Sequence, residues 1–194
     1  MKLNEALNLV LPVGDKQAYH TPISREVFEA NYRILAATKA ALSSKGVFYQ
    51  MDAGPRIAAL TLRDEARKDA EDRGDVDDKG TADDAVAQAL LAEIKRLTMV
   101  LCPSSKGFDP LPVDAAIQGG HIDADDWREA ESAIVFFTCL LSMSAKAHRK
   151  AIAQATAGLL KASITSQQPM EVCASLQTST LQETSKVEAS AVPS

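Results

Sequence analysis

The residues that most resemble a metal-binding group form a short acidic run in the middle of the chain. Asp75, Asp77 and Gly80 stand at positions 1, 3 and 6 of an EF-hand loop, which carry two acidic ligands and a glycine. The fifth position is Lys79, and the twelfth, where calcium needs a bidentate glutamate, is Val86. A cation and an apolar side chain at these positions oppose calcium binding. The run therefore indicates a solvated acidic linker, and we expect no metal site.

Histidine and cysteine, the other residues that commonly carry chemistry, are few and scattered. His20, His121 and His148 stand in no metal-binding or catalytic pattern. His121 follows two glycines, but no second ligand or base accompanies it, so an exposed loop histidine is the simpler interpretation. The three cysteines lack a paired spacing, which favours reduced thiols in a cytoplasm over a disulfide framework.

A cluster of carboxylates between Asp123 and Glu131 is the remaining candidate for acid–base catalysis. These residues begin an apolar periodic stretch, where the helix dipole favours anions and where Asp123 suits the N-cap. Helix-start electrostatics therefore account for the cluster. Nucleotide-binding glycine motifs and the Gly-x-Ser-x-Gly nucleophile motif are absent. We expect no enzymatic activity, no catalytic residues and no cofactor.

The carboxylates belong to the stretch that organises the chain, from Asp123 to about Ile164. Its apolar residues recur at spacings of three and four, which predicts one long helix. Basic residues fall in its second half, where a helix C-terminus favours cations. The middle is apolar on more than one face, which is typical of a helix inside a bundle or shared with another chain. The residues assigned here to partner binding are Trp127, Ile134, Phe136, Phe137, Leu140 and Leu141.

Helical patterns also predict the rest of the body. Ser24 suits an N-cap, with Ile23 and Phe28 as a hydrophobic staple, and an alternative cap at Thr21 with Pro22 at N1 would start the helix three residues earlier. Gly46 suits the end of that helix. Val47–Met51 is the only strand-like run, and since it has no partner strand we expect a loop or edge segment. The fold class that follows is all-α, a small helical bundle with one long C-terminal helix. The other predicted helices cover residues 3–11, 55–73, 81–101 and 113–118.

Composition divides the chain into a body and a tail. We expect a helical domain over residues 1–162, with an acidic linker near 72–82, and a disordered tail over 163–194. The last 32 residues include eleven Ser or Thr and few bulky apolar side chains, so little offsets the entropy of ordering them. The net charge is −5, and no basic stripe suggests nucleic-acid binding. The most apolar window, 133–143, is too short to span a bilayer, which predicts a soluble cytoplasmic protein without a membrane partner.

Four runs of the sequence resemble small proteins from siphophage tail gene clusters, usually called tail assembly chaperones. The runs are Tyr19–Phe28, Met51–Arg56, Ile94–Leu101 and the region from Asp114 to Ser132. The resemblance implies a protein that coats the helical tape measure protein in the host cell cytoplasm. It would keep this client soluble while tail tube subunits polymerise around it, and then leave the particle.

The partners implied by this resemblance are the tape measure protein and, as a second candidate, the tail tube protein. The helical surfaces also allow a homo-oligomer. The alternative interpretation is a structural virion protein, such as a minor tail or connector component. A helical body without a reactive constellation fits both interpretations.

Overall fold

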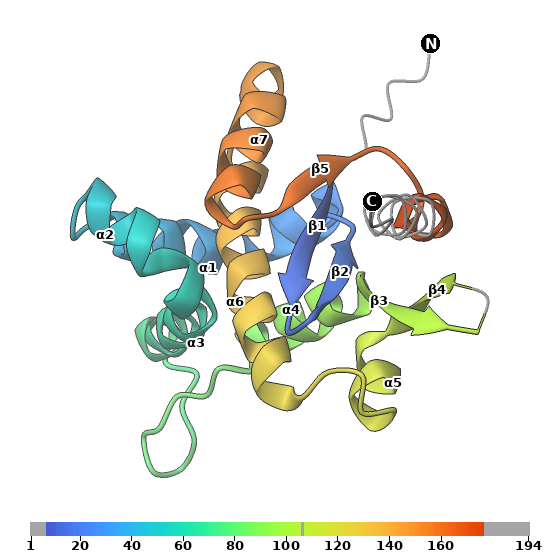
Figure 1. Cartoon of the computed structure of the whole chain (residues 1–194). Helices are drawn as coiled ribbons and strands as arrows, with labels where there is room; N and C mark the ends of the chain where they lie inside the picture. The colour runs from blue at the N-terminus through green and yellow to red at the C-terminus, as the bar shows by residue number, and fades with distance from the viewer. Residues whose placement is uncertain (1–6, 106, 177–194) are drawn as a thin grey trace, which may run out of the picture.

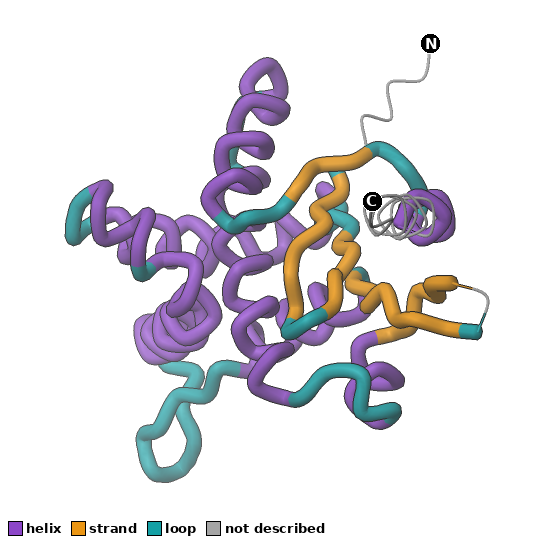
Figure 2. Tube along the Cα trace, viewed as in Figure 1, coloured by secondary structure: helices purple, strands orange, loops and turns teal. Residues whose placement is uncertain are grey.

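A five-stranded antiparallel sheet runs through the fold, in the order β4-β3-β2-β1-β5. The expected all-α class is therefore wrong, and the protein has a mixed α and β fold. The computed structural model describes residues 7–105 and 107–176. Figures 1 and 2 show the sheet with most helices gathered on one side of it. The strands are β1 (Asn8–Val13), β2 (Lys16–His20), β3 (Thr98–Ser104), β4 (Gly107–Pro112) and β5 (Ser163–Thr165).

The helices form the larger part of the chain. In chain order they are α1 (Arg25–Ser43), α2 (Val47–Asp52), α3 (Gly54–Arg73), α4 (Ala85–Arg96), α5 (Val113–Gln118), α6 (Ala124–Ser142), the 3-10 turn η1 (Lys146–His148) and α7 (Arg149–Leu159). Residues 169–176 are also helical. Helix α6 packs against α3, α1 and α7, and it also contacts β1.

The alternation of side chains along the strands gives the sheet two buried faces. Leu9 and Leu11 of β1 and Val100 of β3 lie in the main core with the helices. On the opposite face, Val10 and Tyr19 pack with residues of the helix at 169–176 in a second, smaller cluster. A sheet covered on both faces leaves no polar face, which is why its strands do not read as simple apolar–polar alternation.

Some helix boundaries follow the local chemistry of the sequence. The hydroxyl of Ser24 accepts a hydrogen bond from the backbone N–H of Val27, so the expected N-cap of α1 is confirmed. Asp123 caps α6 and forms a full capping box with Asp126, as helix-start electrostatics predicted. The short helix at Val113–Gln118 is also confirmed.

Other predicted elements are wrong. The helix expected at residues 3–11 is replaced by β1, and the helix expected to run to Leu101 ends at Arg96, before β3. The run Val47–Met51, expected as a loop or edge segment, belongs to the helix α2. The single long helix is interrupted after Ser142, and its second half forms α7 and β5.

The segments expected as a linker and a tail contain ordered elements. Residues 163–165 form β5, which pairs with β1 through Ile164 opposite Leu9. Within the acidic segment near 72–82, one carboxylate oxygen of Asp77 accepts hydrogen bonds from the backbone N–H groups of Lys79 and Thr81, which makes a tight turn. Residues 177–194, the greater part of the expected disordered tail, lie outside the described residues.

Candidate functional site

The six residues assigned to partner binding lie on α6 and contribute to the core. Trp127 and Leu141 are 6% and 7% exposed, and Ile134, Phe136 and Phe137 are fully buried. Leu140 is half-buried and packs against the same cluster. The sheet and the surrounding helices bury α6 on several sides, so packing within one chain accounts for its apolar excess without a partner.

Phe136 shows how closely α6 packs on its neighbours. A Cβ atom placed on Gly54, at the start of α3, would lie 2.7 Å from the Cε2 atom of Phe136. Only a residue without a side chain permits this approach. The contact joins the first turn of α3 to the middle of α6, and it fixes Phe136 as a core residue rather than a surface residue.

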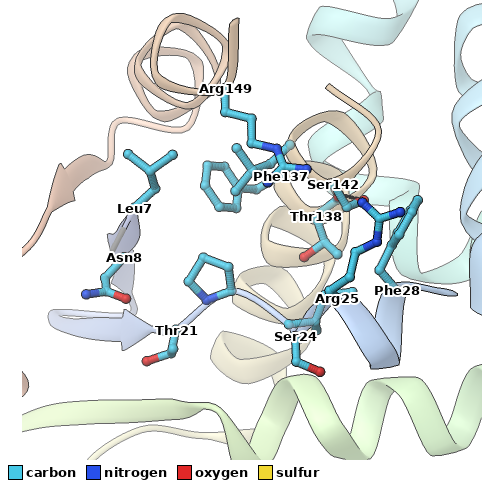
Figure 3. Close-up of a pocket in the computed structure, with 13 residues that line it drawn as sticks. Leu7, Asn8, Thr21, Ser24, Arg25, Phe28, Phe137, Thr138, Ser142 and Arg149 are labelled. Carbon is cyan, nitrogen blue, oxygen red and sulfur yellow. Dashed lines mark hydrogen bonds between the residues drawn. The ribbon is translucent and has the colours of Figure 1, made fainter. Parts of the chain in front are cut away.

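Phe137 and Leu141 line a surface cavity of about 320 Å³, called the groove below. Its walls come from the entrance to β1, the segment between β2 and α1, the first turn of α1 and the end of α6. Figure 3 shows these segments converging around the groove. The apolar lining residues are Leu7, Pro22, Ile23, Phe28, Phe137 and Leu141.

Two hydroxyl groups at the groove are engaged by the backbone. Ser24 caps α1, and the hydroxyl of Ser142 donates to the carbonyl oxygen of Thr138 at 2.6 Å. Asn8 and Thr138 also line the groove and are only 2% and 4% exposed. In the part of the chain that the structure describes, neither of these two side chains forms a hydrogen bond.

Two arginines complete the lining. Arg25 comes from the first turn of α1, where it pairs with Glu29 on the surface. Arg149 opens α7, and its Nε donates to the carbonyl oxygen of Ser144 at 3.2 Å. Among the described residues that line the groove, none carries a carboxylate side chain. Within residues 7–105 and 107–176, the groove is thus an apolar cavity whose charged lining groups are both cations.

The interruption after Ser142 changes the electrostatics expected for this region. The basic residues were expected at the C-terminal end of one long helix. Lys146, Arg149 and Lys150 instead lie at the start of α7, where the helix dipole disfavours cations. Among the described residues, none of these three cations forms an ion pair. The start of α7 is therefore a place where an anion would be stabilised.

A second exposed feature lies on α2, at the far end of α1 from the groove. Val47 is 74%, Phe48 is 86% and Met51 is 43% exposed, and the three are called the α2 face below. Spacings of three and four along a helix place these side chains on neighbouring positions of one side. The sequence did not predict this surface, because Val47–Met51 was interpreted as a loop or edge segment with packed aromatic side chains. The glycine before this run and the acidic turn after it are the local signals of an exposed element.

The residues considered for chemistry stay apart in the structure. His20 is buried in β2, whereas His148 is exposed before α7. All three cysteines are buried and reduced, and burial raises the pKa of Cys139 to about 12. Across the described ranges, no group of three or more His, Cys, Asp or Glu side chains is arranged to hold a metal ion.

Comparisons with known protein families, curated proteins and solved structures found no match to this chain. The site is therefore interpreted from its own geometry. Each helix within residues 7–105 and 107–176 is too short or too polar to cross a membrane.

Proposed function

We propose that this protein is a phage tail assembly chaperone, which binds the helical tape measure protein and keeps it soluble while tail tube subunits assemble. The observation that carries the proposal is the α2 face, an exposed group of large apolar side chains on a surface helix. The resemblance of four sequence runs to tail assembly chaperones supports the same function.

The α2 face has the properties of a docking surface for an apolar client. Contiguous exposed apolar side chains on a folded protein commonly mark an interaction site. Phe48 is the most exposed of the large apolar residues, so burying it against a client removes its surface from water without disturbing the core. An amphipathic helix is a suitable client, since its apolar side can cover such a face.

Charged and polar groups surround the α2 face. The Nζ atom of Lys45 lies 5.0 Å from the centre of the Tyr49 ring, and Arg56 pairs with Asp52 at 3.4 Å on the surface. A polar border around an apolar centre is the usual arrangement of a protein–protein contact.

The role that we propose is binding and not catalysis, and it takes place in the host cell cytoplasm. The tail tube protein is a second partner under this proposal, and homo-oligomerisation through the same apolar face is compatible with it. No cofactor takes part.

Co-expression with the tape measure protein of the same phage tests the proposal. We expect the tape measure protein to move from the insoluble to the soluble fraction and to co-purify with this chain. An insoluble client and no co-purification would contradict it. Mass spectrometry of purified particles separates the alternative, because a stoichiometric amount in the virion would assign the chain as a structural component.

A further inference from the structure

The groove has the size and lining of a small-ligand site. Its volume of about 320 Å³ lies at the lower end of the range of about 300–1,000 Å³ that is usual for ligand pockets. Such pockets combine an apolar lining with a few polar groups that orient the ligand. Phe28, Phe137 and Leu141 give the apolar lining, and they come from α1 and α6.

Thr138 gives the first indication of a polar ligand group. Thr38, Thr61 and Thr156, which also lie in helices, each donate their hydroxyl to the carbonyl oxygen four residues earlier. Thr138 forms no such bond among the described residues, although it is 4% exposed. Figure 3 shows its hydroxyl directed into the groove. Among the described residues, His20 Nε2 is the one buried side-chain nitrogen or oxygen without a partner, so the Thr138 hydroxyl is accessible from the groove and a ligand can hydrogen-bond to it.

Asn8 is a second polar lining residue without a side-chain hydrogen bond among the described residues, on the opposite wall of the groove. It is 2% exposed, it lies at the entrance to β1, and within the described chain its amide forms no side-chain hydrogen bond. Two polar side chains without a hydrogen bond inside the described chain thus line one apolar cavity, from β1 and from α6.

The charged residues at the groove favour a negatively charged ligand. Arg25 and Arg149 line the groove, the start of α7 adds its own positive dipole end, and none of the described lining residues is a carboxylate. The Arg25 pair with Glu29 is exposed, and pairs of this kind contribute little, so Arg25 is available to a competing anion. A guanidinium group binds a carboxylate through two parallel hydrogen bonds.

We propose that the groove binds a small amphipathic carboxylate. Its apolar body packs on the partly exposed Ile23 and Phe28, above the buried Phe137 and Leu141, and its carboxylate pairs with Arg25 and Arg149. The side chains of Asn8 and Thr138, which line the same cavity, supply the hydrogen bonds that orient it. This site is separate from the α2 face and goes beyond the chaperone function.

Calorimetric titration of the purified full chain with octanoate tests the site. Three matched probes separate its parts: octylammonium reverses the charge, octan-1-ol removes the charge, and acetate removes the apolar body. We expect saturable one-to-one binding of octanoate and at least about tenfold weaker binding of each other probe, because each lacks either the arginine pairing or the apolar contact.

Two substitutions at the groove locate the binding. Arg149→Gln should weaken octanoate binding about tenfold or more, because it removes a charge-assisted hydrogen bond. Thr138→Val should weaken it about three- to tenfold. It should also leave the free protein as stable as the wild type or more stable, since the hydroxyl has no partner to lose.

Matched controls are available elsewhere in the chain. Arg128→Gln makes the same charge change at the exposed start of α6, and Thr38→Val removes a buried hydroxyl that already has a partner. Both should retain wild-type octanoate affinity, whereas Thr38→Val should lower the melting temperature. The proposal is overturned by no saturable octanoate binding, by equal binding of octylammonium, or by unchanged affinity in both groove variants.

Discussion

The Nδ1 atom of His20 lies 2.9 Å from the Oγ1 atom of Thr98, inside the core between β2 and β3. The hydroxyl of Thr98 donates to the carbonyl oxygen of Ile94 at 2.7 Å, so it must accept a hydrogen bond from His20. This arrangement places the imidazole proton on Nδ1. The Nε2 atom is buried and has no hydrogen-bond partner within the described residues. His20 is thus held in its neutral form.

Burial makes His20 a source of acid sensitivity, because it lowers the pKa of this side chain to about 3. Between pH 6.5 and about 3 the unfolded chain binds a proton at His20 and the folded chain does not, so stability falls as the pH falls through this window. The expected slope is about 1.4 kcal/mol for each pH unit in the window. Urea unfolding at several pH values measures it.

His20→Asn is the matched variant for this measurement. The asparagine amide can still donate to Thr98, but it does not titrate. We expect a smaller dependence of unfolding free energy on pH between pH 6 and pH 4 than in the wild type. An identical dependence in both proteins would show that other groups dominate the acid response.

Phe136 is fully buried and Phe48 is 86% exposed, so replacing each by alanine should affect the free energy of unfolding very differently. Phe136→Ala should lower the free energy of unfolding by about 3–5 kcal/mol, because it leaves a cavity between α6 and α3. Phe48→Ala should change it by less than about 0.5 kcal/mol. Similar losses in both variants, measured by chemical denaturation, would contradict the packing described for the two helices.

Gly54 and Gly158 form another matched pair. Gly54→Ala should destabilise the protein by about 1–3 kcal/mol, because the added methyl meets Phe136 in a closely packed core. A methyl on Gly158, in α7, meets no atom within 4 Å, so Gly158→Ala should stabilise the protein by up to about 1 kcal/mol. Thermal unfolding of the two variants measures the difference. Equal melting temperatures would contradict the close contact between α3 and α6.

Asp84 joins α3 to the start of α4. Its carboxylate accepts hydrogen bonds from Gln88, Arg63 and Arg67, and the bond from Gln88 does most to hold its pKa below the usual range. Its contribution to stability is therefore present above the ordinary carboxyl pKa and is lost as the pH falls. Asp84→Asn should cost about 1–2 kcal/mol at neutral pH, with the partly exposed arginines limiting the loss.

The control for Asp84 is Asp78→Asn, which makes the same change at an exposed position of the acidic turn. We expect this control to unfold like the wild type in denaturant. A loss of the same size in both variants would mean that overall charge, rather than the junction of α3 and α4, determines the effect.

Sequence reasoning predicted the helix starts because their signals are local. Ser24 and Asp123 each lie within three residues of the backbone groups that they cap. The sheet was missed because its pairing is not local: His20 of β2 lies opposite Thr98 of β3, far along the chain. Pro12 in β1 also argues against a strand when only the local sequence is considered, because proline has no backbone N–H to donate. β1 nevertheless pairs with β2.

The groove was missed for a related reason. Periodicity continues across Ser142, with no glycine or proline to end α6, and so it predicted one long helix. Two serines give the local signal that α6 ends here. The hydroxyls of Ser142 and Ser144 donate hydrogen bonds to backbone carbonyl oxygens of the last turn of α6. The interruption places Arg149 in the lining of the same cavity as Arg25, which only the folded chain can show.

The central claim is that the α2 face holds the tape measure protein. The most direct test measures the soluble fraction of the tape measure protein co-expressed with the Val47→Ser/Phe48→Ser variant, or with Met170→Ser as a control. Met170 is a 61% exposed apolar residue on the helix at 169–176, away from α2. We predict that the wild type and the control keep the client soluble, while the double variant folds with an unchanged melting temperature and leaves the client insoluble. A double variant that keeps the client as soluble as the wild type does would contradict the claim.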